Sequence, residues 1–345
     1  MKAIKYIASL LAGITLFSCD NFEDINTNPD SVTKVSPKLL ATGAIVGLMK
    51  PSQKKDFVYN QMTCKYIGWS EALEGTQYNN FGRESFSGYT SLTNYKLMAE
   101  LTDKDETMNE DKRNAYKGLA LFLKAYRLFE YTLNVGDIPY EGILEGKEGN
   151  LTVAYNTQED VFKFLLNDLD KAHEYFRNAN QTTFDGDPIF GGKVEQWHRV
   201  SNALELRVLI NLSKKINSTD INIKSKFNEV LDRNLLLRSN ADNLQITFST
   251  KEGQLYPFNE SLHSYKQYVM ISGLVIDALK ANEDYRLFYY ANPSEGKLNS
   301  GSQENDWDAY IGIDPSDPID ERILPVQQQV YFLRTRRTLY PYRLC

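Results

Sequence analysis

Apolar side chains recur at every third or fourth position along long stretches of the chain, and this spacing predicts a mainly helical protein. The clearest stretch covers residues 111–134 and stops at the breaker cluster 136–139. One stripe along it consists of Ala115, Leu119, Phe122, Tyr126, Phe129 and Leu133. The same spacing predicts further helices at 36–48, 57–73, 89–101, 157–176, 194–216 and 268–281.

Local residue choices mark some of the element boundaries. Ser36 and Pro37 suit the cap and first turn of a helix, and Thr157 with Asp160 forms a capping-box start. Alternating apolar and polar residues at 244–248 predict a short strand. Paired helices joined by short turns predict tetratricopeptide-like stacking, although the consensus of that repeat is not visible.

The N-terminus carries a different apolar pattern. Lys2 and Lys5 precede an apolar stretch at 7–17. This stretch is shorter than the roughly 20 residues that span a bilayer, and it is typical of a signal peptide. It ends at Leu16-Phe17-Ser18-Cys19, which resembles the lipobox of bacterial lipoproteins. The alternative is a buried helix with an incidental cysteine, which the polar segment 20–30 disfavours.

These patterns predict how the chain is organised. We expect a signal peptide at 1–18, a lipidated Cys19 carrying palmitate, a flexible acidic tether at 19–35, and a single helical domain at 36–345. The protein would then be held at a membrane by its lipid.

Charge and composition exclude several function classes. The 345-residue chain has a formal charge of −6, so it lacks the basic balance expected of a nucleic-acid partner. Besides Cys19 there are only Cys64 and Cys345, and three scattered histidines. This predicts neither a disulfide framework nor a metal site. We expect no cofactor, and the sequence contains no catalytic motif that we recognise. The 22 tyrosines, 17 phenylalanines and 3 tryptophans suit partly wet surfaces on which sugar rings stack.

Five blocks follow one another along the chain in a recognisable order. They are residues 22–30, Ala125–Phe129 with Gly136-Asp137-Ile138-Pro139-Tyr140, the helix at 157–172, Asp187–Gly192 with Trp197 and 202–207, and Glu283–Arg286 with Ala291-Asn292-Pro293. The fourth block, "G-G-x-x-x-x-W … N-x-L-x-L-R", is the most specific. Together they resemble the SusD/RagB family of Bacteroidetes surface lipoproteins over roughly residues 16–315. In the fifth block Tyr285 stands where the family has a proline.

This resemblance implies a helical scaffold of tetratricopeptide-like pairs with an irregular, loop-rich binding face and few short strands. Family members bind glycans, and sometimes peptides, at the cell surface. They sit over a SusC-type TonB-dependent transporter and are not enzymes. The implied partners are therefore that transporter, an oligosaccharide or polysaccharide, and the outer membrane through the lipid anchor. The acidic residues after Cys19 resemble a surface-export signal, which implies that the protein faces the cell exterior.

The C-terminal stretch departs from the family pattern. Family members continue with further helices, whereas residues 330–345 form a basic tail in an acidic protein. One hypothesis is a product truncated or frame-shifted after about residue 320, and the alternative is a short member of the family.

Two groups of residues are candidate ligand-binding sites. Trp69 lies next to the polar, glycine-bounded loop 74–82, and Trp307 lies in the polar loop 305–312. The candidates are Trp69, Tyr78, Asn79 and Phe81 in the first group, and Trp307 and Tyr310 in the second. Aromatic faces suit the apolar side of a pyranose, and amides suit its hydroxyl rim. The alternative for Trp69 is a core position on a helix, and we expect Trp197 to be core.

Three functions compete. The first is a ligand-capturing lipoprotein that works with a transporter. The second is a helical scaffold or adhesion lipoprotein that binds protein. The third, a glycoside hydrolase with paired carboxylates, has no supporting motif.

Overall fold

The computed structural model describes residues 35–49, 59–69, 83, 85–146, 149–150, 152–179, 181–256, 269–317 and 342–343. The predicted signal peptide, Cys19 and almost all of the tether lie outside these residues, as does most of the basic tail. Within the described part of the chain, no helix is both long and apolar enough to cross a membrane.

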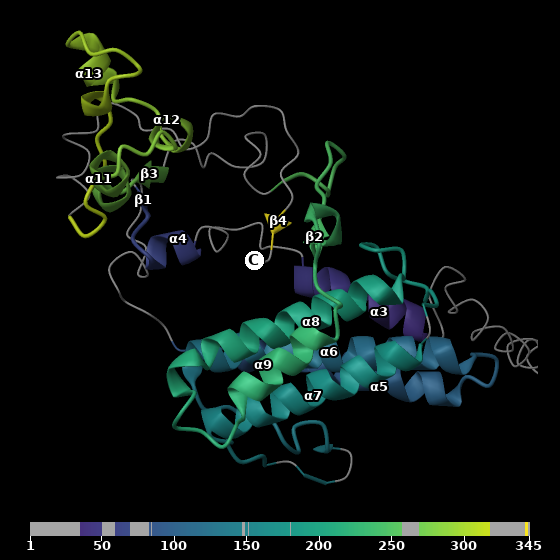
Figure 1. Cartoon of the computed structure of the whole chain (residues 1–345). Helices are drawn as coiled ribbons and strands as arrows, with labels where there is room; N and C mark the ends of the chain where they lie inside the picture. The colour runs from purple at the N-terminus through teal and green to yellow at the C-terminus, as the bar shows by residue number, and fades with distance from the viewer. Residues whose placement is uncertain are drawn as a thin grey trace, which may run out of the picture.

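A bundle of long helices forms the larger part of the molecule (Figure 1). Its helices are α3 (Pro37–Met49), α5 (Thr90–Lys104), α6 (Glu110–Val135), α7 (Gln158–Asn178), α8 (Val194–Asn211) and α9 (Ile223–Asp232). Short 3₁₀ helices flank them at η3 (Phe86–Tyr89), η5 (Ser213–Lys215) and η6 (Asn240–Asp242). Helix α6 lies at the centre and packs against α3, α5, α7 and α8. The predicted mainly helical fold is confirmed.

The apolar stripes of the sequence form the core of this bundle. In α6 the stripe is buried from Ala115 to Phe129, whereas Leu133 at its end is exposed. In α7 every stripe position from Val161 to Phe176 is buried, and in α8 Trp197 is fully buried. The burial of apolar surface along these stripes stabilises the bundle because each helix covers the apolar face of its neighbour.

The expected helix caps form with local differences. Ser36 Oγ accepts from the backbone N–H of Leu39 at 3.4 Å, and Thr157 Oγ1 accepts from that of Asp160 at 3.2 Å. The Asp160 carboxylate accepts from the Thr157 hydroxyl at 2.7 Å, whereas a complete capping box would use the backbone N–H. Helix α6 ends at Gly136, whose φ of 85° is a conformation that glycine adopts without strain.

The most specific sequence block has a structural role. The Asp187 carboxylate accepts from the backbone N–H groups of Ile189 at 2.8 Å and Gly192 at 2.9 Å, and from Trp197 Nε1 at 2.8 Å. At Gly192 φ is +79°, and an added Cβ would lie 1.8 Å from the carbonyl oxygen of Phe184. The glycine is therefore required by the close approach of two backbone segments that lead into α8.

Polar contacts join the last helices of the bundle. Arg233, at the end of α9, donates to Glu205 Oε2 at 2.7 Å and lies 3.1 Å from Asp170 Oδ1 of α7. Between α7 and α8, His198 Nε2 lies 2.6 Å from His173 Nδ1. These pairs satisfy polar groups that packing buries between the helices.

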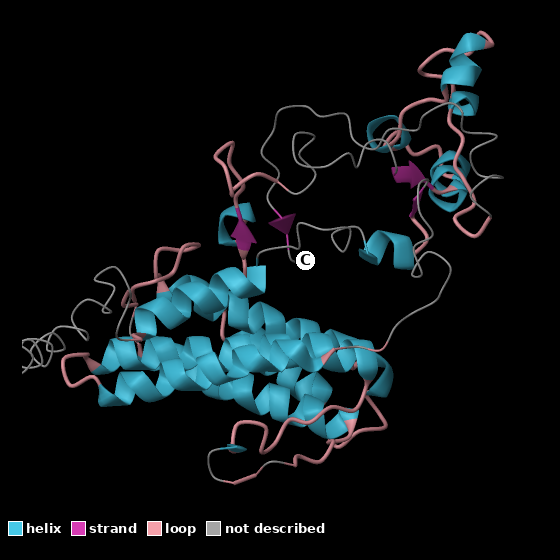
Figure 2. Cartoon of the chain, turned by 180° about the vertical axis from the view of Figure 1, so that it is seen from behind, coloured by secondary structure: helices cyan, strands magenta, loops and turns pink. Residues whose placement is uncertain are grey.

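A second, smaller unit lies apart from the bundle in both overall views (Figures 1 and 2). It contains α4 (Tyr59–Thr63), β1 (Ile67–Trp69), β3 (Val269–Ile271), α11 (Gly273–Ala281), α12 (Leu287–Tyr290), α13 (Glu295–Asn299) and η7 (Trp307–Ala309). Strands β1 and β3 pair antiparallel, with Ile67 opposite Ile271. A separate core of Ile271, Ile276, Leu287, Ala291, Ala309 and Tyr310 holds α11, α12 and η7 together.

Two predicted helices are wrong in part. The helix expected at 57–73 is helical only at 59–63 in its described part, because Lys65 adopts a φ of 60° and residues 67–69 then pair with β3. The helix expected at 268–281 starts with that partner strand and becomes helical only from Gly273. Tertiary pairing between distant segments overrides local helix spacing here.

The strand expected at 244–248 is confirmed over two residues. Strand β2 (Gln245–Ile246) pairs antiparallel with β4 (Tyr342–Arg343). Sequence pattern predicted the existence of this element, whereas its partner is set by the fold.

Candidate functional site

The first predicted platform is only partly described. Trp69 belongs to β1, where its backbone lies opposite Val269, so the helix expected at this position is not formed. Tyr78, Asn79 and Phe81 lie outside the described residues. Their role in ligand binding stays a prediction.

The second candidate group belongs to the smaller unit, and its two members differ. Tyr310 is 3% exposed; its ring packs edge-on against Phe288 with centroids 5.2 Å apart, and its hydroxyl donates to the carbonyl oxygen of Glu304 at 2.8 Å. Trp307 is half-buried in η7. Tyr310 therefore lies beneath the surface as support, while Trp307 is the member of the pair with an accessible side chain.

Sequence reasoning missed the most exposed member of this group. Tyr285 is 76% exposed, and its ring centroid lies 5.5 Å from that of Trp307. The ring centroid of Phe288 lies 4.8 Å from that of Trp307 and 5.8 Å from that of Tyr285. We call Tyr285, Phe288 and Trp307 the aromatic platform. The aromatic run Tyr285–Tyr290 is the sequence feature that could have indicated it.

A tight turn presents Tyr285 without the proline of the family pattern. Glu283 adopts a φ of 48°, and the Asp284 carboxylate accepts from the backbone N–H of Arg286 at 3.0 Å and from its Nε at 2.8 Å. These hydrogen bonds from Arg286 hold the pKa of Asp284 below its usual value. The side-chain and backbone contacts of one aspartate thus form the turn that proline would otherwise favour.

The aromatic platform has the composition of a sugar-stacking surface. Two further aromatic side chains, Tyr289 and Tyr290, are exposed on α12, the short helix that also carries Phe288. Their ring centroids lie 5.7 Å apart. Aromatic faces bind the apolar side of a pyranose, and charged or amide side chains around them bind hydroxyl groups. Asp284 and Arg286 lie beside the platform, and Asp306 and Asp308 flank Trp307 in the sequence.

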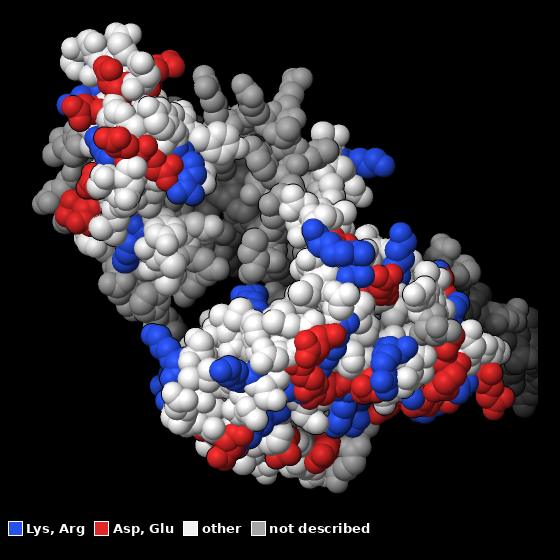
Figure 3. Space-filling view, in the orientation of Figure 1, with Lys and Arg blue, Asp and Glu red and all other residues white. Residues whose placement is uncertain are grey.

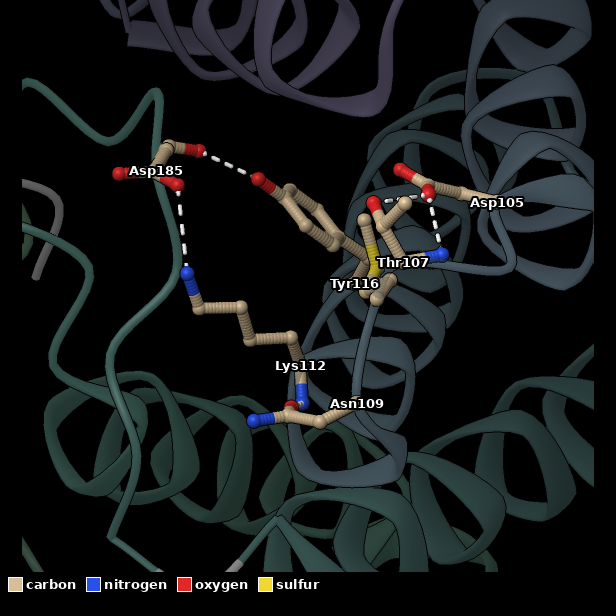
Figure 4. Close-up of a pocket in the computed structure, with 7 residues that line it drawn as sticks. Asp105, Thr107, Asn109, Lys112, Tyr116 and Asp185 are labelled. Carbon is tan, nitrogen blue, oxygen red and sulfur yellow. Dashed lines mark hydrogen bonds and ion pairs between the residues drawn. The ribbon is translucent and has the colours of Figure 1, made fainter.

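A cavity in the described part of the bundle is a second place where a small ligand could fit (Figure 4). Its volume is about 290 Å³, and it lies between the α5–α6 turn and the loop that carries Asp185. The lining residues are Asp105, Thr107, Met108, Asn109, Lys112, Tyr116 and Asp185. It is smaller and more polar than most ligand pockets.

The polar groups of this cavity already bind one another. Asp105 accepts from the Thr107 hydroxyl at 2.6 Å, and these contacts lower the pKa of Asp105. Tyr116 donates to the carbonyl oxygen of Asp185 at 2.8 Å, and Lys112 Nζ lies 3.5 Å from the Asp185 carboxylate (Figure 4). The contacts attach the loop to α6, so we regard the aromatic platform as the stronger candidate site.

Metal-ligating side chains do not cluster in the described ranges. No group of three or more His, Cys, Asp or Glu side chains is placed there to hold a metal ion. His173 and His198 contact each other, and burial together with the nearby His173 and Arg233 lowers the pKa of His198 to about 3. Of the acidic run 314–321, only Asp314 and Asp317 are described.

Comparisons with known proteins agree with the fold. A family model described as SusD-like, starch-binding and associating with the outer membrane matches residues 29–327. A SusD homolog from Bacteroides fragilis NCTC 9343 is 40% identical with a TM-score of 0.78, over 86% of this chain and 62% of its own. A second SusD homolog from that strain is 28% identical with a TM-score of 0.76, over 90% of this chain and 65% of its own.

A third solved structure has been described as an outer membrane protein. This protein of Bacteroides vulgatus ATCC 8482, described as probably involved in nutrient binding, is 26% identical with a TM-score of 0.75, over 90% of this chain and 66% of its own. The chain thus spans less than two thirds of the length of these three solved relatives. Among curated proteins, none matches it significantly.

Proposed function

Because the chain belongs to the SusD-like family of starch-binding proteins that associate with the outer membrane, we propose that it captures glycans at the cell surface and passes them to a SusC-type TonB-dependent transporter. In this proposal the protein is exported by residues 1–18 and anchored through a lipid on Cys19. We expect binding without turnover of the glycan, because the family is described as starch-binding.

The observation that carries the proposal is the exposed aromatic platform. The ring centroids of Tyr285 and Trp307 lie 5.5 Å apart, and Phe288, which packs against the core of the smaller unit, contacts both rings. A fully buried pair would serve packing alone, but Tyr285 leaves most of its ring accessible to solvent. Rigid aromatic side chains on a packed base bind with a small loss of conformational entropy.

Binding of soluble starch and a panel of other neutral polysaccharides tests the platform. We expect Tyr285→Ala and Trp307→Ala each to weaken binding about tenfold in affinity electrophoresis, since truncation of a central aromatic anchor typically costs more than 1 kcal/mol. Tyr155→Ala is the matched control, because Tyr155 is 63% exposed and edge-on to Phe86 at 6.3 Å, but lies in the bundle.

The variants distinguish the possible outcomes. Unchanged binding in both platform variants would place the site elsewhere, and Trp69→Ala would then test the first predicted group. Failure of the wild-type protein to bind any member of the panel would contradict glycan capture. Release of shorter sugars on prolonged incubation would contradict binding without turnover.

A further inference from the structure

Charge is distributed unevenly between the two parts of the molecule. The smaller unit, residues 59–69 and 269–317, contains nine carboxylates but four lysine and arginine side chains. The other described residues from 35 to 256 contain 24 carboxylates and 22 such cations, so they are close to balanced. In the space-filling view, red and blue side chains both lie on the bundle and on the smaller unit, so the imbalance is seen in the count and not as a separate patch (Figure 3).

The imbalance extends to the immediate surroundings of the aromatic platform. Two cations of the smaller unit are each paired with an acid: Arg286 is bound to Asp284 by its Nε, and Lys280 Nζ lies 4.0 Å from Asp308 Oδ1. Asp306, which accepts from the backbone N–H of Gln303 at 2.7 Å, adds a further negative charge beside Trp307. Glu283 adds another beside Tyr285 and is exposed. These four carboxylates and two cations thus leave two more negative than positive charges beside the platform.

This charge acts on whatever stacks on the aromatic rings. A ligand carboxylate about 8 Å from each of two uncompensated carboxylates is repelled through water strongly enough to weaken binding about fivefold at low salt. A neutral sugar is not repelled, and an ammonium group is attracted. Glycan binding sites with one sign of charge select ligands in this way without any new contact.

We propose that the aromatic platform selects neutral or positively charged sugars and discriminates against glycans that carry uronic-acid, carboxylate or sulfate groups. This inference rests on the proposed function, because it names the ligand class of the same site. It predicts that the negative rim excludes anionic polysaccharides that would otherwise stack equally well.

The test compares derivatives of one polysaccharide backbone, so that sugar stereochemistry is constant. The probes are the neutral polysaccharide bound in the panel, soluble starch in the first instance, and its carboxymethyl and aminoethyl derivatives. We expect the carboxymethyl derivative to bind about fivefold more weakly than the neutral polymer in 20 mM salt, and the difference to shrink in 500 mM salt. The aminoethyl derivative should bind at least as tightly as the neutral one.

A matched pair of variants isolates the charge. Asp308 is 97% exposed in the smaller unit, and Asp220 is 93% exposed in the bundle, where it lies 3.7 Å from Lys163. Asp308→Asn should reduce the discrimination against the carboxymethyl derivative about twofold, because it removes one negative charge. Asp220→Asn should leave the discrimination unchanged.

The remaining outcomes separate a failure of the charge selection from a failure of glycan capture. Equal binding of the carboxymethyl and neutral polymers would overturn the selection by charge while leaving glycan capture intact. Weaker binding of the carboxymethyl polymer that persists in 500 mM salt and in Asp308→Asn would also overturn the selection by charge, because the cause would then be steric. No binding by any of the polymers would overturn the proposed function, and this inference with it.

Discussion

The bundle and the smaller unit use the same residue type, tryptophan, in different environments. In the bundle, Trp197 is fully buried and its indole N–H is bound by Asp187. In the smaller unit, Trp307 is half-buried and lies beside the exposed ring of Tyr285. The sequence blocks that identify the family concentrate in the bundle, where they close turns and satisfy buried polar groups. A recognisable motif here marks a requirement of folding, and the candidate binding surface lies where the motif departs from the family pattern.

The largest expected effect concerns the two tryptophans. Trp197→Ala should lower the free energy of unfolding by about 3–5 kcal/mol, because it removes a fully buried ring that packs against Phe122 and leaves a cavity. Trp307→Ala should cost less than half as much, because that side chain is partly solvated. Chemical denaturation followed by circular dichroism measures both. Equal losses would show that the platform is as much a part of a core as Trp197 is.

Acid should weaken the bundle through its histidine pair. Burial and the nearby charges of Arg233 and Arg199 lower the pKa of His198 to about 3, and burial also lowers the pKa of His173. The folded state therefore binds a proton less tightly than the unfolded state, whose pKa is near 6.5. Stability is complete above pH 6.5 and falls as the pH drops toward 3, by about 1.4 kcal/mol per pH unit for His198, and the lowered pKa of His173 acts in the same direction.

A variant that cannot take up the proton is the control for this loss of stability in acid. His198→Phe should flatten the dependence of unfolding free energy on pH, measured by denaturation between pH 7 and 4.5. The described residues of the smaller unit include no histidine, so binding at the platform should not follow the same curve while the bundle stays folded. An identical slope in the variant and the wild-type protein would exclude His198 as the cause.

The smallest expected effect on stability is that of Tyr285→Ala. An exposed side chain outside the core usually changes the unfolding free energy by less than about 0.5 kcal/mol. The same variant should nevertheless lose glycan binding, which would separate the platform from the fold. A shift of several degrees in the melting temperature would instead give Tyr285 a structural role.

The long helices of the bundle were predictable because their determinants are local. The spacing of Val161, Leu165 and Leu169 defines one helix face, and Thr157 caps the helix that carries it. Such patterns predict that a helix forms and which side it buries. They also predicted Trp197 as core, which the structure confirms.

The platform was only half predictable. Trp307 and Tyr310 were found because they lie close together in a polar loop, but the sequence does not show that one is beneath the surface and the other accessible. Tyr285 could not be assigned to the same site, because the contact between its ring and Trp307 joins the turn before α12 to η7, two segments that are separated along the chain.

The sequence by itself determined the helical class of the protein, the buried stripes of its bundle and the family to which it belongs, because spacing, caps and motif order act over a few neighbouring residues. Only the tertiary structure decided that Ile67 pairs with Ile271, so that residues 67–69 form a strand where the spacing predicted a helix. It also decided which aromatic rings meet at the surface. Both outcomes depend on contacts between segments far apart along the chain, and local pattern carries no information about such contacts.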